Sequence, residues 1–399
     1  MYDVIVVGAR CAGAPTAMLL ARAGYRVLLI DRARFPSDTL STHYLHLPAV
    51  RQLAKWKLLD ELLASGCPPM RRTIYHVADA TGREVRLVGS PPPLDGHDAS
   101  YAPRRYVLDT LLVRAATAAG AEFRENCAVT GLLRDESGCV TGVRFRTDGQ
   151  ARETTEHASL VVGADGKRSA IARLAGAEVT RRDPLLTCAY YSYWDKVPTD
   201  FELHERPGRW VGALRTHDAT LVAAYFPQKQ FPAVRADAQR AYLENIRGTA
   251  PELYERLQGG TQLERLYGTG DQQNFFRRAH GPGWVLIGDA AHHKDSITAR
   301  GITDAFAQAQ LLVGCLGESI QDRLELNTAL HRFGECRDAL LDPVYQGTIV
   351  VAHLQVQPDR LALLQLIGQD QELTNRYFAA VAGILTVEEL YTPDLLAQL

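Results

Sequence analysis

Residues 3–31, DVIVVGARCAGAPTAMLLARAGYRVLLID, decide the fold of this chain. The continuous apolar run at residues 4–7 predicts a strand that is buried on both faces. A glycine turn, a helix over residues 13–23 and a second strand at residues 27–30 follow, and the second strand ends at Asp31. This order is typical of the adenosine-binding half of a dinucleotide fold, in which a helix N-terminus favours a pyrophosphate.

The turn between the first strand and the helix reads G-A-R-C-A-G. Gly8 permits the turn, and Gly13 lets the helix pack closely on the sheet. Arg10 stands where such turns usually have their middle glycine. Its side chain must turn away from the pyrophosphate or contact the phosphates. Asp31 follows Gly13 at the sequence separation at which an acidic residue can bind the ribose of the nucleotide. This spacing argues against the alternative, a Rossmann-like unit that binds no nucleotide. We therefore expect FAD or NAD.

Composition and charge exclude several other classes of protein. The chain has 399 residues, a formal net charge of −2 and 46% hydrophobic residues, which predicts an ordinary globular protein without a nucleic-acid footprint. The seven cysteines contain no C-x-x-C pair, so neither a metal site nor a disulfide framework is indicated. The first strand starts at the initiator Met and no apolar run has the length of a membrane span, so we expect a cytoplasmic protein.

Two further buried strands end in glycine turns that carry a carboxylate. Residues 158–173, ASLVVGADGKRSAIAR, place Asp165 at a strand end, where it can approach a cofactor or simply cap the next helix. Residues 284–304, WVLIGDAAHHKDSITARGITD, place Gly288 and Asp289 at another strand end and then enter a helix. A helix N-terminus at that point can stabilise negative charge on an electron-rich ring.

In this order and spacing, the three motifs resemble the flavoprotein monooxygenases of the para-hydroxybenzoate hydroxylase type. Geranylgeranyl reductases and flavin-dependent halogenases are relatives of that group. The resemblance covers roughly residues 1–320. It implies an α/β fold with a Rossmann-like FAD-binding domain of the glutathione-reductase type, an inserted mixed-sheet substrate domain and a helical C-terminus.

Changes of composition along the chain predict how these parts divide. The FAD-binding domain is expected at residues 1–70, 98–183 and 270–340, the sheet-based substrate domain at residues 71–97 and 184–269, and the helical segment at residues 341–399.

The resemblance implies that three distant loops hold FAD. The cofactor-binding residues that it implies are Gly8, Arg10, Gly13, Asp31, Arg105, Asp165, Gly288, Asp289, Ala299, Gly301 and Ile302. Arg105 would contact the phosphate or ribityl region, and residues 299–302 would approach the flavin ring through their backbones. Family members commonly have a proline where this chain has Ser296, and serine does not fix φ as proline does.

Two groups of residues are candidates for the substrate side of the site. His43 and Asp295 are expected to line the site and to act as acid, base or positioning groups. Tyr190, Tyr191, Trp210 and Ser296 are expected to line the substrate pocket. Tyr190 and Tyr191 are neighbours in a predicted strand, so they must point to opposite faces of the sheet. No metal ligands are predicted.

The resemblance implies a monooxygenase in which reduced flavin takes up O2 to give a C4a-hydroperoxide. The expected substrate is a small aromatic or secondary metabolite, either free or tethered to a carrier protein. No second glycine-rich dinucleotide site is visible, so NAD(P)H would bind transiently or a separate flavin reductase would supply electrons.

Three alternatives remain open at this stage. The first is a reductase of the geranylgeranyl type that saturates prenyl double bonds. The second is a halogenase, although the W-x-W-x-I-P segment of many halogenases is absent. The third is an FAD-binding protein without enzymatic activity. The oligomeric state has no sequence signal.

Overall fold

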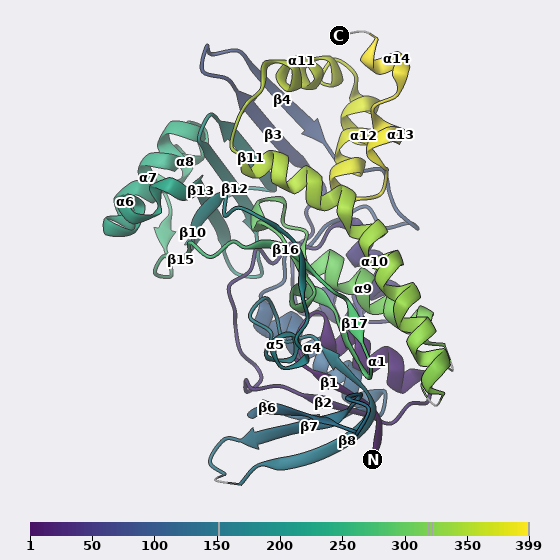
Figure 1. Cartoon of the computed structure of the whole chain (residues 1–399). Coiled ribbons are helices and arrows are strands. Elements are labelled where there is room, and N and C mark those ends of the chain that lie inside the picture. Colours follow the sequence, from purple (N-terminus) through teal and green to yellow (C-terminus); the bar gives the residue numbers. More distant parts are fainter. Residues whose placement is uncertain (151, 318–319, 321, 398–399) are drawn as a thin grey trace.

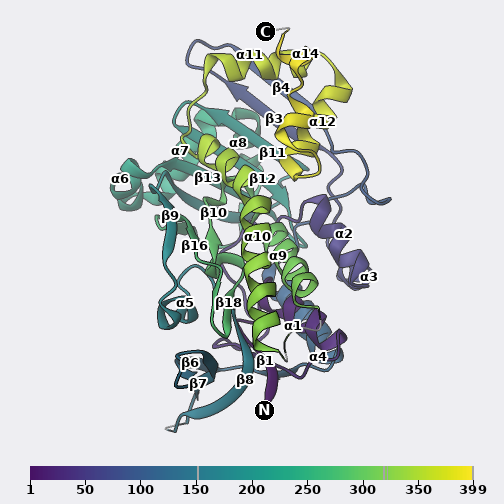
Figure 2. The same cartoon turned by 45° about the vertical axis from the view of Figure 1, so that its right-hand side comes forward.

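The computed structural model describes residues 1–150, 152–317, 320 and 322–397, and Figures 1 and 2 show their arrangement. A parallel sheet lies near the N-terminus, a second sheet lies at the other end, and the C-terminal helices cover part of the second sheet. The predicted α/β fold with a helical C-terminus is confirmed.

The parallel sheet is built around the first strand of the chain. Its strands run in the order β17 (His280–Gly281), β18 (Trp284–Leu286), β8 (Thr154–Gly163), β1 (Tyr2–Val7), β2 (Val27–Ile30) and β5 (Glu122–Arg124). The edge strand β17 is antiparallel to β18, and the other pairs in this order are parallel. β1 lies between β2 and β8 and is parallel to both, with Val4 opposite Val27 and Leu160. The predicted buried strand and the glycine turn after it therefore lie at the centre of this sheet.

Different layers cover the two faces of the parallel sheet. Val4 and Val6 pack with the helices on one face, which are α1 (Gly13–Arg22), α4 (Arg105–Ala118) and α9 (Gly301–Leu316). Ile5 and Val7 pack toward the other face, which is covered by β6 (Cys127–Arg134), β7 (Val140–Thr147) and α5 (Ala170–Ala175). Every residue of β1 from Val4 onward is thus buried, because both faces are covered.

The second sheet carries many of the aromatic side chains, and we call it the aromatic sheet. Its order is β14 (Thr261–Gln262), β10 (Thr187–Asp195), β13 (Thr220–Pro227), β12 (Arg209–Arg215), β11 (Phe201–Arg206), β3 (Thr73–Ala78) and β4 (Glu84–Gly89), and β15 (Tyr267–Thr269) also pairs with β10. β3 pairs with β11 in parallel, which joins two distant parts of the chain. These strands fall within the two ranges expected for the substrate domain, although the domain boundaries themselves stay a prediction.

The two faces of the aromatic sheet have different partners. Cys188, Tyr190 and Trp194 pack on the outer face, under α6 (Phe231–Ala236), α7 (Ala238–Thr249) and α8 (Pro251–Gln258). Ala189 and Tyr193 belong to the inner face, whose cluster includes Tyr225, Trp210, Ile297 and residues of the C-terminal helices. The alternation predicted for this strand is therefore present.

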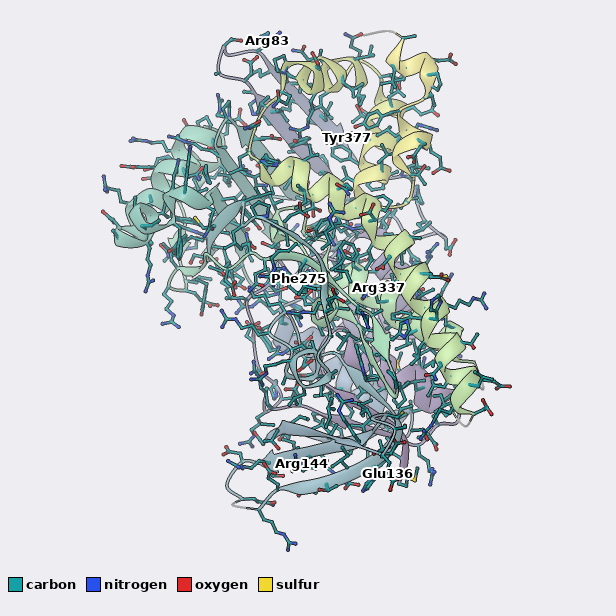
Figure 3. The ribbon with its side chains drawn as sticks, in the orientation of Figure 1. Arg83, Glu136, Arg144, Phe275, Arg337 and Tyr377 are labelled. Atoms are coloured by element: carbon teal, nitrogen blue, oxygen red, sulfur yellow. The ribbon has the colours of Figure 1, made fainter. Side chains whose placement is uncertain are left out.

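The remaining elements connect the two sheets. α10 (Arg323–Ala352) runs along the molecule beside both of them (Figures 1 and 2). α11 (Pro358–Ile367), α12 (Gln371–Ala382), α13 (Val387–Leu390) and α14 (Pro393–Leu396) then lie at the β3–β4 end. A small sheet of β9 (Val179–Asp183), β16 (Asn274–Arg277) and β19 (His292–His293) lies between the two larger sheets. The helices α2 (Leu47–Lys55) and α3 (Leu59–Ala64) follow the loop after β2. Figure 3 shows Phe275 and Arg337 in this middle region.

Candidate functional site

The glycine turn after β1 is shaped for an anion. Gly8 has φ of +103°, and a Cβ at Gly13 would lie 1.7 Å from the carbonyl oxygen of Gly8. Within the described part of the chain, no group accepts a hydrogen bond from the backbone N–H groups of residues 10–13. Four free donors at the start of a ten-residue helix fit the diphosphate of a dinucleotide.

Arg10 turns toward α4. Its Nη1 donates to Oδ2 of Asp109 over 2.7 Å, and its Nη2 donates to Oγ of Ser37 over 2.9 Å. Arg105 donates to Oδ1 of the same Asp109 from Nε and Nη2, over 3.1 and 3.0 Å. Asp109 is completely buried and holds two guanidinium groups, so this cluster has a net positive charge beside the diphosphate turn.

The thiol of Cys11 completes this cluster. Its Sγ donates to Oδ1 of Asp109 over 3.3 Å. Burial raises the pKa of the Cys11 thiol well above its usual range, so the thiol stays protonated. Cys11 is therefore a packed donor in the turn and not a reactive thiolate.

Asp31 braces the same turn from the end of β2. Its Oδ2 accepts from the backbone N–H of Ala9 and its Oδ1 from that of Ala33, both over 2.7 Å. The carboxylate is buried, and each oxygen keeps lone pairs for a further donor such as a ribose hydroxyl. A ribose-binding role for Asp31 stays a prediction.

The third loop lies against the first. Gly288 has φ of +57°, and a Cβ there would lie 2.7 Å from Cβ of Ala12. The Asp289 carboxylate is about half exposed next to this contact. Ala299 has a left-handed φ of +54°, and α9 starts two residues later at Gly301, with Ile302 buried. Residues 288–302 thus start against the glycine turn and end in the first turn of α9.

Asp165 has a local structural role in the loop between β8 and α5. Its Oδ2 accepts from the backbone N–H of Ala170 over 2.6 Å and from that of Ile171 over 3.2 Å, while Ser169 donates to Oδ1 over 2.5 Å. The carboxylate therefore caps α5, which was the alternative to a cofactor contact. A cofactor-binding role for Asp165 stays a prediction.

His43 lies at the centre of a polar aromatic cluster. It is fully buried, has a left-handed φ of +60°, and its Nε2 lies 2.5 Å from Oη of Tyr193. Its Nδ1 is buried without a hydrogen-bond partner among the described residues. Burial lowers the pKa of His43 to about 3, so the imidazole is neutral at physiological pH. A strained, buried histidine with one unused nitrogen is the arrangement expected of a ligand-binding group.

Arg104 positions Tyr193. Its guanidinium carbon lies 3.9 Å from the centroid of the Tyr193 ring, and it donates to Asp38 and Glu264 from either side. Burial also raises the pKa of Tyr193, which keeps the phenol protonated. The cluster therefore joins the loop after β2, the start of α4 and the aromatic sheet.

Asp295 is buried and fully engaged. Its Oδ2 accepts from Thr187 over 2.6 Å, and its Oδ1 accepts from Gln272 over 3.3 Å and from the backbone N–H of Ile297 over 3.1 Å. Burial raises the pKa of Asp295 to about 6. The structure thus gives Asp295 a structural role between the aromatic sheet and the loop before α9.

The four residues expected to line the substrate pocket are separated by the structure. Tyr191 lies on the inner face, stacked on Tyr267 with ring centroids 5.5 Å apart, and Trp210 is buried on the same face. Ser296 Oγ lies 2.9 Å from Oη of Tyr225, also on this face. Tyr190 packs on the outer face under the helices, so it cannot line the same pocket as Tyr191.

Sequence reasoning missed three residues that organise the site. Asp109 had a signal, because it stands four residues after Arg105, the spacing of a helical ion pair. The contacts of Arg104 and Tyr193 had no signal in the sequence. Asp38, a partner of Arg104, lies 66 residues away, and His43, the partner of Tyr193, lies 150 residues away.

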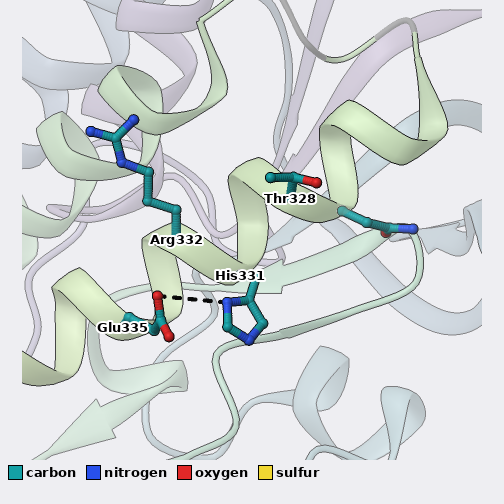
Figure 4. A pocket seen from close by; sticks show the side chains of 5 residues that line it. Thr328, His331, Arg332 and Glu335 are labelled. Atoms are coloured by element: carbon teal, nitrogen blue, oxygen red, sulfur yellow. Dashed lines mark ion pairs between the residues drawn. The ribbon is translucent and has the colours of Figure 1, made fainter.

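Other features of the described chain point elsewhere. A hollow on α10 is lined by Asn327, Thr328, His331, Arg332 and Glu335 (Figure 4). Its His331–Glu335 pair spans 3.6 Å and is about two-thirds exposed, as is usual for a solvated helix surface. The described residues contain no cluster of three potential metal ligands, and none of their helices has the length and hydropathy needed to cross a membrane.

Comparison with known proteins shows similarity to FAD-dependent enzymes. The family model described as FAD binding domain matches residues 1–330. Over its whole length, the chain is 27% identical to 98% of a digeranylgeranylglycerophospholipid reductase of Methanocella arvoryzae. Over 97% of its length, it is 26% identical to 77% of a 12-dehydrotetracycline 5-monooxygenase/anhydrotetracycline 6-monooxygenase of Streptomyces rimosus subsp. rimosus.

The fold is also shared with solved structures. The flavin-dependent brominase Bmp2 superposes with a TM-score of 0.83 at 17% identity, over 100% of this chain and 97% of the brominase. At that identity the similarity concerns the fold alone.

Proposed function

Since the chain belongs to the FAD-binding domain family and is an FAD-dependent oxidoreductase, we propose that it is a monooxygenase that hydroxylates a small aromatic or secondary metabolite. NAD(P)H, directly or through a separate flavin reductase, is the proposed source of electrons. Reduced FAD supplies the chemistry for activating O2. The protein then has to bind and orient the substrate and keep water out.

The observation that carries this proposal is the inner face of the aromatic sheet. Tyr191, Tyr193, Tyr225 and Trp210 lie on this face, opposite the loop that leads from Gly288 to α9. Aromatic side chains give a flat apolar substrate a large contact area, and their hydroxyl groups can orient its polar atoms. A cofactor that starts at the glycine turn and follows this loop ends beside that face.

His43 and Tyr193 are the proposed polar contacts of the substrate. The neutral imidazole and the phenol share one hydrogen bond, which leaves Nδ1 of His43 free to donate to or accept from a substrate oxygen. The cation above the Tyr193 ring and the two carboxylates around Arg104 fix the phenol in place. In this proposal His43 and Tyr193 hold the substrate hydroxyl or carbonyl, and Asp295 supports the loop behind it.

Oxygen consumption tests the proposal. Purified protein with FAD and NADH or NADPH should consume O2 faster when a hydroxylatable aromatic metabolite is added, with stoichiometric hydroxylated product. Tyr193→Phe removes one hydroxyl group and should lower kcat/KM for that substrate by about tenfold, the equivalent of one hydrogen bond.

Tyr190→Phe is the matched control, because Tyr190 is a tyrosine of the same strand, β10, but packs on the outer face. It should leave kcat/KM unchanged. Equal losses in the two variants, or no product from a broad panel of aromatic metabolites, would contradict the proposal.

A reductase that saturates prenyl double bonds is the second candidate. The match to archaeal reductases over the whole chain, including the helical region after residue 340, favours it. The apolar stretch LALLQLIG at residues 361–368 lies in this region. Anaerobic reduction of a prenyl double bond by the reduced protein, without O2 consumption, would support this candidate. A halide-dependent product would instead indicate a halogenase.

A further inference from the structure

Three charged side chains are buried together where the loop after β18 enters α9. Lys294 donates to Oδ2 of Asp304, and Nη2 of Arg300 lies 3.2 Å from Oδ1 of the same carboxylate. Each of these side chains is less than one-tenth exposed. We call Lys294, Arg300 and Asp304 the charged triad.

The charged triad has one positive charge more than it can neutralise itself. Burial alone would raise the pKa of Asp304, but Lys294 and Arg300 hold it at about 2, so the carboxylate is ionised. His46 and His292 lie close enough to the triad for its charges to act on their pKa values. Burial is the main influence and lowers both pKa values, so both imidazoles are neutral. Two cations and one anion leave a formal net charge of +1 inside the protein. Nη1 of Arg300 also donates to the carbonyl oxygen of Ala382 at the C-terminal end of α12, which offsets part of this charge.

The excess charge lies at a helix N-terminus that has unused donors. α9 is 16 residues long, and the described part of the chain offers no acceptor to the backbone N–H groups of residues 301–303. Oγ1 of Thr303 and Nε of Arg300 are also buried without a partner there. The helix dipole adds a further positive potential at this end.

The loop that leads into this helix terminus starts beside the glycine turn after β1. Residues 288–301 start against Ala12 in the glycine turn after β1 and reach the aromatic sheet, where Ser296 contacts Tyr225. Nε2 of His46, the residue before α2, lies 3.3 Å from the carbonyl oxygen of Thr298. A cofactor that spans from the diphosphate turn to the aromatic face therefore passes the start of α9.

We propose that the charged triad raises the reduction potential of bound FAD by placing a net positive charge beside the flavin ring. Two-electron reduction with uptake of one proton leaves one negative charge on a ring that was neutral when oxidised. The electrons come from an external reductant, either NAD(P)H or dithionite. The triad stabilises the added negative charge, so it favours the reduced state. This role rests on the proposed place of the ring, but it does not depend on hydroxylation.

Substitutions in the triad change its charge in opposite directions. Lys294→Met lowers the net charge from +1 to 0, and Asp304→Asn raises it to +2. The double variant Lys294→Met/Asp304→Asn restores +1 but removes the ion pair. Lys294→Arg keeps both the charge and a donor. Lys229→Met, an exposed lysine beside the outer helices, is the matched control.

The experiment is a dithionite titration of each FAD-loaded protein against a redox dye of known potential. Lys294→Met should shift the equilibrium toward oxidised flavin by about tenfold, which is about 30 mV for two electrons. Asp304→Asn should shift it toward reduced flavin. The double variant, Lys294→Arg and Lys229→Met should stay near the wild-type potential.

The order of the potentials separates an electrostatic role from a structural one. A merely structural triad predicts that the double variant is disturbed most, or that both single variants shift the potential in the same direction, and either result overturns the proposal. If Lys294→Met does not retain FAD, Lys294→Gln replaces it, and loss of FAD from every triad variant also overturns the proposal. A protein that hydroxylates nothing can still show the expected order, so the two proposals fail independently.

Discussion

Single residues at this site are specified by contacts that a one-atom change can disturb. Asp295 shows this most clearly, because it is nearly fully buried and accepts three hydrogen bonds from Thr187, Gln272 and Ile297. None of these donors carries a charge, so burial dominates and raises the pKa of this carboxyl to about 6 from an ordinary value of 3.8.

The raised pKa of Asp295 predicts how stability depends on pH. Because the folded state holds the proton more tightly than the unfolded state, the stability from this group is fully present below about pH 4 and is lost as the pH rises through 6. Asp295→Asn cannot titrate. Its free energy of unfolding relative to wild type should therefore rise by roughly 3 kcal/mol between pH 4 and pH 7, at about 1.4 kcal/mol per pKa unit.

Urea denaturation of both proteins at several pH values measures this difference. Asp60→Asn, at an exposed carboxylate, is the control and should give a curve parallel to that of wild type. A parallel curve for Asp295→Asn would show that Asp295 titrates normally in the folded protein.

Elements distant in sequence are held together by buried ion pairs as well as by apolar packing. Arg360 of α11 contacts Glu205 of β11 through two hydrogen bonds, over 2.8 and 2.9 Å, and Tyr75 of β3 donates to the same carboxylate. Tyr377 of α12 stacks on Tyr75 with ring centroids 6.1 Å apart. Figure 3 shows Tyr377 where the C-terminal helices meet the aromatic sheet.

This contact predicts what attaches the C-terminal helices to the aromatic sheet. Glu205 is completely buried, so Arg360→Met leaves an uncompensated charge and should lower the free energy of unfolding by roughly 3–5 kcal/mol. Arg360→Met/Glu205→Met removes both charges and should recover most of that loss. The exposed substitution Arg114→Met should change stability by less than about 0.5 kcal/mol.

Chemical denaturation measures the stability of these variants, and limited proteolysis after residue 354 reports whether the helices detach. A double variant as unstable as Arg360→Met would mean that the pair contributes through packing and not through charge compensation.

The whole molecule behaves as two sheets joined by several connections. α10 runs beside both sheets, β3 and β11 pair across distant segments, and Asp295 and Arg104 bridge the loops of one sheet to the other. The path that we propose for FAD lies along these bridges. We therefore expect the two sheets and the cofactor site to unfold together.

Two probes in one urea titration test this expectation. Tryptophan fluorescence reports on both parts, because Trp56 and Trp284 pack with the parallel sheet and Trp194 and Trp210 with the aromatic sheet. The release of FAD, followed by flavin fluorescence, should have the same midpoint as the tryptophan signal. A flavin transition that clearly precedes the tryptophan transition would show that the cofactor site opens before the core unfolds.

Elements whose signals are local could be predicted from the amino-acid sequence. The strand, turn and helix at residues 2–22 follow from an apolar run and two glycines, and the two faces of β10 follow from the alternation of its side chains. The three glycine turns and their carboxylates predicted the family and FAD, because the backbone geometry that binds a diphosphate needs those residue types at those spacings.

Which side chains contact one another became visible in the three-dimensional fold. Arg10 meets Asp109 from 99 residues away and His43 meets Tyr193 from 150. Loops of the other sheet lie against the inner face of the aromatic sheet, which is why we propose that the substrate binds there. Turns and periodicity depend on neighbouring residues, whereas burial and hydrogen-bond partners depend on which distant segments the fold brings together. This is also why Tyr190, one residue from Tyr191, packs under helices and not beside the site.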